Sequence, residues 1–118
     1  MSKLINRFKF PLAGFITILK KDRNFILHII FAMLVIIFGF IFNLNLNEWL
    51  WIILAIFIVL ITEVINTSIE YVVDLYTDEY HPLAKHAKDT AAFAVLLASI
   101  MSVLIGGLIF LPKIINIF

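Results

Sequence analysis

The sequence has no cysteine and little charge. Of its 118 residues, 14% are Asp, Glu, Lys or Arg, whereas 64% are hydrophobic. The absence of cysteine excludes disulfides and cysteine metal sites within this sequence. The formal net charge of +1 is too small to indicate nucleic acid as a partner. Only four glycines are present, and no Gly-rich phosphate-binding loop of the P-loop or Rossmann kind occurs.

Apolar residues dominate the chain, whose mean hydropathy is +1.11. A soluble domain of this size could not bury so much apolar surface, because small domains keep a large fraction of their surface exposed. The lipid bilayer must therefore be the solvent for most of the chain. We expect an all-α integral membrane protein that forms one domain over residues 1–118.

Three long apolar stretches predict three transmembrane helices, over residues 25–42, 48–75 and 82–111. The first contains one polar side chain, His28, and the third begins with Pro82, a residue favoured at the first position of a helix. A cleaved signal peptide is not expected, because the first apolar run begins only at Phe25 and is too long for one.

The first 22 residues have the pattern of an amphipathic helix, with apolar residues on one face and Lys3, Arg7 and Lys20 away from it. Such a helix is expected to lie on the membrane surface. Basic residues are frequent before the first span, absent from the first loop, and present in the second loop as Lys85 and Lys88. The positive-inside rule then places the N-terminus in the cytoplasm and the C-terminus outside.

Four polar residues share one face of the second predicted span: Glu63, Asn66, Glu70 and Asp74. At 100° per residue they fall within an arc of roughly 80°. A carboxylate in hydrocarbon costs about 3 kcal/mol or more, so a row of acids in a membrane helix indicates a functional site. By helix length, Glu63 lies beneath the inner membrane boundary and Asp74 lies in the cytoplasm.

Other polar groups lie on the same side of the membrane, namely Asp22 before the first span and Lys88 and Asp89 in the third. Carboxylates, water and phosphate oxygens are the usual ligands of Mg²⁺, and a lysine at the membrane edge can pair with phosphate. Phosphoryl transfer requires positioning, charge neutralisation and a group near the attacking hydroxyl. All of these residue types are present on this side of the membrane.

Other interpretations remain open at this point. Buried Asn and Glu also act as polar contacts between membrane helices. Intramembrane acids mark ion paths, so a small proton- or cation-conducting oligomer is an alternative, as is an accessory subunit without chemistry. Conduction is disfavoured because no polar side chain lies between Trp49 and Ile61. His28 is interpreted as an interfacial residue, and no function is assigned to it.

Several motifs resemble those of one family. The run from Glu63 to Asp74, Glu-Val-Ile-Asn-Thr-Ser-Ile-Glu-Tyr-Val-Val-Asp, resembles the signature of the prokaryotic diacylglycerol kinase and undecaprenol kinase family. The stretch from His81 to Asp89 resembles its second motif. Asp22-Arg23-Asn24-Phe25 with His28 resembles the element before its first span. Phe8-Lys9-Phe10 with Gly14 fits its N-terminal segment. The resemblance covers nearly the whole chain.

The resemblance implies a homotrimer of three-span subunits in the bacterial inner membrane, with sites shared between neighbouring subunits. It implies transfer of the ATP γ-phosphate to a lipid alcohol, with Mg²⁺. By motif, Glu63 would be the base or orienting acid at the lipid hydroxyl and Asn66 would position substrate. Glu70 and Asp22 would bind the metal, while Asp74, Lys88 and Asp89 would hold nucleotide or brace these groups.

The chain departs from the family pattern at two positions. Asp22 stands where the family usually has Glu, and Phe93 stands where it usually has a small residue. The shorter Asp22 side chain predicts looser or water-mediated metal coordination. The Asp-Arg-Asn-Phe element, His28 and the His-Pro-Leu-Ala-Lys run look more like the undecaprenol kinase branch than the diacylglycerol kinase branch.

Overall fold

Four α-helices make up the part of the chain that the structure, a computed structural model, describes, residues 2–118. They are α1 (Ser2–Lys21), α2 (Arg23–Ile41), α3 (Leu46–Tyr76) and α4 (Pro82–Ile117). The last three are long and apolar enough to cross a membrane. The predicted all-α fold with three candidate spans is thus confirmed, while Met1, the first residue of the predicted surface helix, lies outside the described residues.

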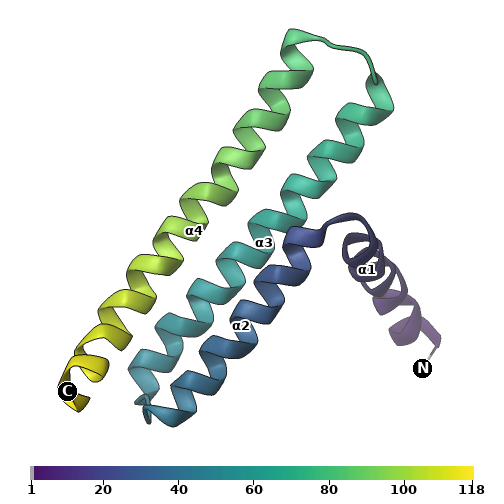
Figure 1. Cartoon of the computed structure of the whole chain (residues 1–118). Helices are drawn as coiled ribbons and strands as arrows, with labels where there is room; N and C mark the ends of the chain where they lie inside the picture. The colour runs from purple at the N-terminus through teal and green to yellow at the C-terminus, as the bar shows by residue number, and fades with distance from the viewer. Residues whose placement is uncertain (1) are drawn as a thin grey trace.

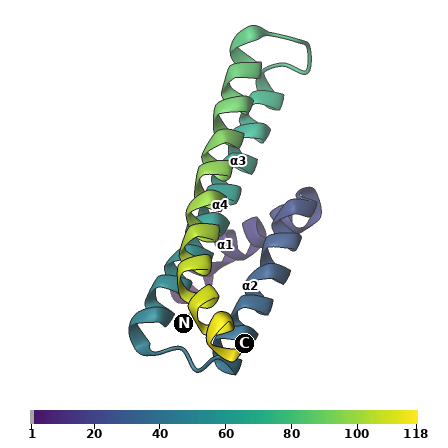
Figure 2. The ribbon, with the colours of Figure 1, turned by 60° about the vertical axis from the view of Figure 1, so that its left-hand side comes forward.

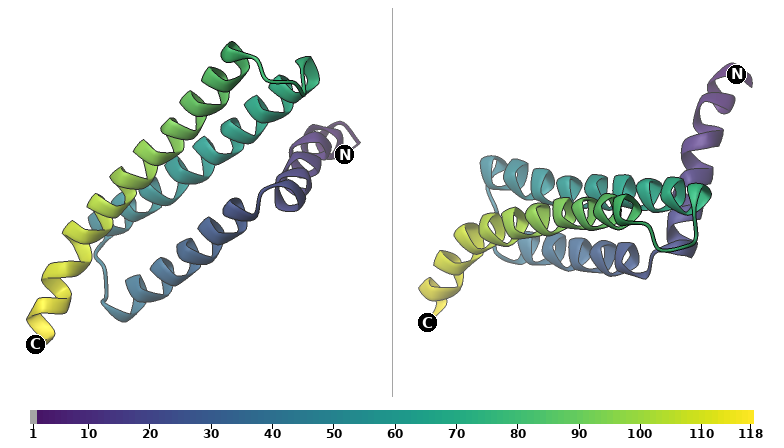
Figure 3. Two further views of the ribbon diagram at one scale, coloured as in Figure 1. Left: turned by 45° about the horizontal axis from the view of Figure 1, so that its top comes forward. Right: turned by 90° about the horizontal axis from the view of Figure 1, so that it is seen from above.

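The longest two helices, α3 and α4, form an antiparallel hairpin that runs the length of the molecule (Figure 1). α3 packs most extensively against α4, and α2 runs beside only one half of α3. The views in Figures 2 and 3 show α1 leaving the three long helices at a steep angle from the beginning of α2. Beyond the beginning of α2, the neighbour of α3 on this side is α1, whose last residue, Lys21, lies with its Nζ 4.7 Å from the centre of the Tyr71 ring.

Side-chain caps fix where α2 and α3 begin. Asp22 is the N-cap of α2, and its Oδ1 accepts a hydrogen bond of 3.0 Å from the Asn24 main-chain N–H. Asn45 caps α3 in a reciprocal capping box with Glu48. Between the two helices Asn43 adopts a left-handed conformation, with φ of 53°, as Asn tolerates better than most residues.

α4 begins with Pro82, as predicted, after His81, whose Nδ1 accepts a hydrogen bond from the Leu83 N–H. The helix continues through Pro112 to Ile117, beyond the predicted end of the third span at Leu111. Near this end Lys113 pairs with Glu48 at 3.2 Å, which joins the end of α4 to the beginning of α3.

One face of α3 is buried against its neighbours. It consists of side chains three or four residues apart: Ile52, Ala55, Val59, Glu63 and Thr67. On α4 the buried residues are small, Ala91 and Ala98, which lets the two helices approach closely. The α3 face is apolar over its first half and polar at Glu63 and Thr67, so the packing surface leads directly into a polar cluster.

Candidate functional site

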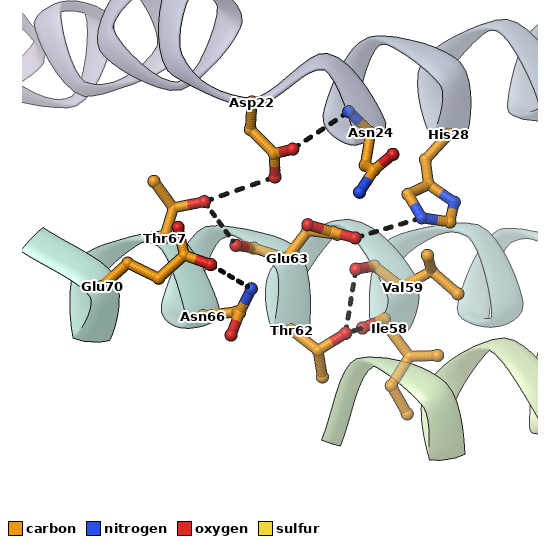
Figure 4. A network of polar contacts seen from close by, with 10 residues as sticks. All are labelled: Asp22, Asn24, His28, Ile58, Val59, Thr62, Glu63, Asn66, Thr67 and Glu70. Atoms are coloured by element: carbon orange, nitrogen blue, oxygen red, sulfur yellow. Dashed lines mark hydrogen bonds and ion pairs between the residues drawn. The ribbon is translucent and has the colours of Figure 1, made fainter. Parts of the chain in front are cut away.

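The centre of the polar cluster is Glu63, which points into the protein. Glu63 is only 4% exposed, and its Oε1 lies 3.2 Å from His28 Nε2 across the α2–α3 interface (Figure 4). The carboxylate therefore faces another helix rather than lipid. A charged or polar group buried among apolar helices needs such a partner, because an unpaired one is costly.

Thr67 and Asp22 continue the cluster toward the end of α2. The Thr67 hydroxyl donates a 3.0 Å hydrogen bond to the Glu63 main-chain oxygen and lies 3.4 Å from Asp22 Oδ2. Figure 4 shows the Asp22 carboxylate on the same side of α3 as the Glu63 side chain. Asp22, which precedes α2, thus lies beside the polar face of α3. Its position in the sequence does not by itself predict this contact.

Asn66 and Glu70 lie one turn further along α3. Asn66 Nδ2 donates to Glu70 Oε1 at 3.4 Å, and both residues are half-buried. Asn66 Oδ1 is buried and has no hydrogen-bond partner among residues 2–118. Because buried acceptors are nearly always paired, this oxygen is available to a donor or cation from outside the chain.

The donor atoms of this cluster suit Mg²⁺, although no three acidic or histidine side chains among residues 2–118 converge tightly enough to hold a metal by themselves. Mg²⁺ usually takes one or two protein carboxylates and completes its shell with water and substrate phosphates. Asp22 and Glu70 provide carboxylate oxygens, whereas the Asn66 amide turns its nitrogen toward Glu70 and its oxygen away from both carboxylates (Figure 4). The residues therefore fit a magnesium ion that is held mainly by its substrate.

The remaining predicted site residues form a second group near the α3–α4 connection. Lys88 Nζ lies 2.7 Å from Asp74 Oδ1, and Lys85 Nζ lies 2.6 Å from Asp89 Oδ2. All four line a pocket of about 240 Å³. The rise of α3 places Asp74 about 16 Å from Glu63 along the helix. The predicted site residues therefore fall into two groups on the same side of the hairpin, rather than into one.

Two larger cavities adjoin the Glu63 cluster, and mostly apolar side chains line both. One, of about 480 Å³, lies between α1 and α3 and includes Thr67. The other, of about 600 Å³, lies between α2 and α4 and includes His28. The lining of the first includes Pro11, Phe15, Phe25 and Tyr71, and that of the second Phe31, Val35, Leu60 and Val103. Apolar ligand segments could approach the cluster from either cavity.

Sequence reasoning missed the two residues that touch Glu63 most directly. The sequence indicates only an interfacial position for His28 and no role for Thr67. Ile52, Val59 and Glu63 are seven and four residues apart, a helical spacing that places them on one face of α3. This spacing is a sequence signal for the face that packs on the neighbouring helices. Which residue of α2 meets that face depends on the register of two helices, and periodicity within one helix does not contain this information.

Comparisons with known proteins identify close relatives. The family model for prokaryotic diacylglycerol kinase matches residues 9–110. The chain is 49% identical over 94 residues to the undecaprenol kinase of Bacillus subtilis, covering 80% of this chain and 76% of that protein. It is 37% identical over 115 residues to the diacylglycerol kinase of Synechocystis, covering 97% of this chain and 66% of that protein.

A third relative is the diacylglycerol kinase of Helicobacter pylori, which is 40% identical over 79 residues, 67% of this chain and 62% of that protein. The matched region thus spans just under two thirds of the Synechocystis and Helicobacter proteins. The comparisons confirm the predicted family and the predicted class of enzyme, a lipid kinase, and the three apolar helices agree with a multi-pass membrane protein. This chain belongs to the prokaryotic diacylglycerol kinase family.

Proposed function

We propose that this protein transfers the γ-phosphoryl group of ATP to the hydroxyl of a lipid alcohol at the cytoplasmic face of the bacterial inner membrane. The supporting observation is that Glu63 is buried between apolar helices and yet lies on the same face of α3 as Glu70 and Asp74. A lipid hydroxyl and a water-soluble phosphate donor need to meet at such a place. We favour undecaprenol as the acceptor, because the Bacillus relative bears that name.

In this proposal Glu63 orients the lipid hydroxyl and accepts its proton. A carboxylate within hydrogen-bonding distance of a hydroxyl raises the nucleophilicity of the hydroxyl oxygen as it attacks phosphorus. Glu63 lies between two mostly apolar cavities, which is where a lipid alcohol would bring its hydroxyl. Asn66, one turn away, would position the substrate through its side-chain amide.

Glu70 and Asp22 would hold Mg²⁺ together with the phosphate oxygens of ATP, and the bound cation would neutralise phosphate charge. The pocket that Asp74, Lys88 and Asp89 line would hold the nucleotide or brace its phosphates. Lys88 is the natural phosphate partner, because its ammonium group can exchange Asp74 for a phosphate oxygen.

The proposed arrangement in the membrane follows the distribution of charge. The N-terminus and the α3–α4 connection would be cytoplasmic, the C-terminus outside, and α1 on the inner leaflet. Lys20 and Lys21 in the last turn of α1 are suited to anionic head groups. The active form would be a homotrimer with sites shared between subunits.

The test is phosphoryl transfer by purified protein in detergent, supplied with Mg²⁺, labelled ATP and either undecaprenol or diacylglycerol. We expect labelled lipid, and more of it with undecaprenol. Glu63→Gln should lower the rate by about 10²-fold or more. The control is Glu48→Gln, the same substitution in the first turn of α3, where Gln can keep the capping box. It should leave the rate within about twofold of the wild type. Absence of labelled lipid with both alcohols would refute the proposal.

A further inference from the structure

We propose that His28 is a positioning residue: it holds the Glu63 carboxylate in the orientation that the lipid hydroxyl needs. This inference rests on the proposed function, in which Glu63 accepts the hydroxyl proton. The observation behind it is the 3.2 Å contact between His28 Nε2 and Glu63 Oε1. One carboxylate oxygen is thereby occupied, and Figure 4 shows the other on the side of Asp22.

The partner of the Glu63 side chain, His28, comes from the first turns of α2. Asp22 precedes the helix, and His28 follows it by six residues, a rise of about 9 Å. Glu63 lies between them on the facing helix (Figure 4). Because His28 can donate a hydrogen bond to Glu63 Oε1, this contact restricts rotation of the carboxylate about its last side-chain bonds. His28 therefore holds the Glu63 carboxylate from the side of α2.

Buried apolar residues border the pair on the side away from Asp22 and Thr67. Val59 lies one turn before Glu63 on the buried face of α3, and Phe25 lies buried one turn before His28. A hydrogen bond in such surroundings is stronger than one in water, and an unpaired carboxylate is correspondingly costly. Without His28 the Glu63 side chain would turn toward another donor and lose its alignment.

The proposed role does not depend on the charge of the imidazole. A histidine with a hydrogen on Nε2, whether neutral or charged, can donate that hydrogen to a carboxylate. The His28 side chain is 28% exposed and lines the α2–α4 cavity. The contact is therefore at the edge of a space that a lipid alcohol could enter, and not sealed within a packed core.

Three variants separate positioning from folding. His28→Met removes the donor and keeps an apolar side chain, whereas His28→Gln keeps an N–H donor. Leu27→Met changes the neighbouring, exposed residue and serves as the control. We expect His28→Met to lower kcat by about 10- to 100-fold, with KM for ATP and for undecaprenol little changed. His28→Gln should keep kcat within about fivefold of the wild type, because the Gln side chain can still donate a hydrogen bond that orients the Glu63 carboxylate.

A double variant tests whether His28 acts through Glu63. In a Glu63→Gln background, His28→Met should cause no further loss, since residues that act as a unit are not additive. A well-folded His28→Met protein with wild-type kcat would overturn the proposal. So would an additive loss in the double variant, or a folded His28→Gln protein as slow as His28→Met. If His28→Met and His28→Leu both fail to fold, the residue is structural and the inference is wrong.

These outcomes are distinct from failure of the proposed function. If the wild-type protein forms no labelled lipid from ATP, the lipid-kinase proposal itself fails, whatever the His28 variants do. If the wild type is active and His28→Met is equally active, only the positioning role is refuted.

Discussion

The Thr67 hydroxyl lies 3.4 Å from Asp22 Oδ2, which connects the residue before α2 to the buried face of α3, 45 residues later. The other Asp22 oxygen, Oδ1, accepts the Asn24 N–H and caps α2. The two oxygens of one carboxylate thus have different partners, and its two roles can be separated by substitution.

Asp22→Asn should keep the cap and remove the charge. Asn and Asp are about equally good N-caps, so we expect the thermal stability in detergent to stay close to the wild type. The Mg²⁺ concentration for half-maximal activity should rise by at least about tenfold. Even a residue that only supports a metal ligand changes metal affinity by about that factor when it is replaced. Asp22→Ala should in addition lose about 1 kcal/mol of stability with the cap. An unchanged Mg²⁺ dependence of Asp22→Asn would exclude Asp22 as a ligand.

Lys88 and Lys113 form α3–α4 ion pairs at opposite ends of the hairpin, at 2.7 Å and 3.2 Å. Lys88→Met should raise KM for ATP by about 10- to 100-fold, because a hydrogen bond to a charged group contributes about 1.5–3 kcal/mol. Lys113→Met should leave this KM unchanged. Both substitutions should alter stability by less than about 1 kcal/mol, as is usual for partly exposed pairs. Equal effects of the two substitutions on KM would contradict a nucleotide role for Lys88.

Gly39 on α2 allows the ring of Trp49 on α3 to approach closely. A Cβ atom at Gly39 would lie 2.5 Å from Trp49 Cη2 and 2.9 Å from Cζ2, so the rigid indole would have to move. We expect Gly39→Ala to destabilise the protein by about 1–3 kcal/mol, measured by thermal unfolding in detergent. Gly14→Ala, where a Cβ would meet nothing within 4 Å, should be neutral or stabilising, since Ala favours helix. Equal unfolding temperatures for the two variants would show that the Gly39 contact is not needed.

Inactive subunits should restore activity to one another if the site is shared. In the proposed trimer, Glu63 of one subunit would act with Lys88 of its neighbour. When Glu63→Gln and Lys88→Met subunits are co-expressed in equal amounts, about a quarter of the junctions in a cyclic trimer combine two intact residues. We therefore expect about a quarter of wild-type activity. Activity no higher than that of either variant alone would place both residues of a working site in one subunit.

Much of the fold follows from patterns along the chain. The apolar stretches predict the three candidate spans, and Pro82 predicts the first residue of α4. The shared helix face of Glu63, Asn66, Glu70 and Asp74 also follows from spacing alone. The degree of burial along this face does not, because α2 covers α3 only as far as Thr67. Glu63 is consequently buried, whereas Asp74 is exposed.

Three properties follow from the amino-acid sequence alone: the all-helical membrane fold, the residues that share a helix face, and the family to which the chain belongs. These properties depend on composition and on intervals within one helix, where geometry is regular. That His28 faces Glu63, that Asp22 reaches Thr67 and that Lys88 pairs with Asp74 depends instead on the tertiary structure. Most of these contacts join different helices, and their pairing depends on how the helices pack, which no period along the chain encodes.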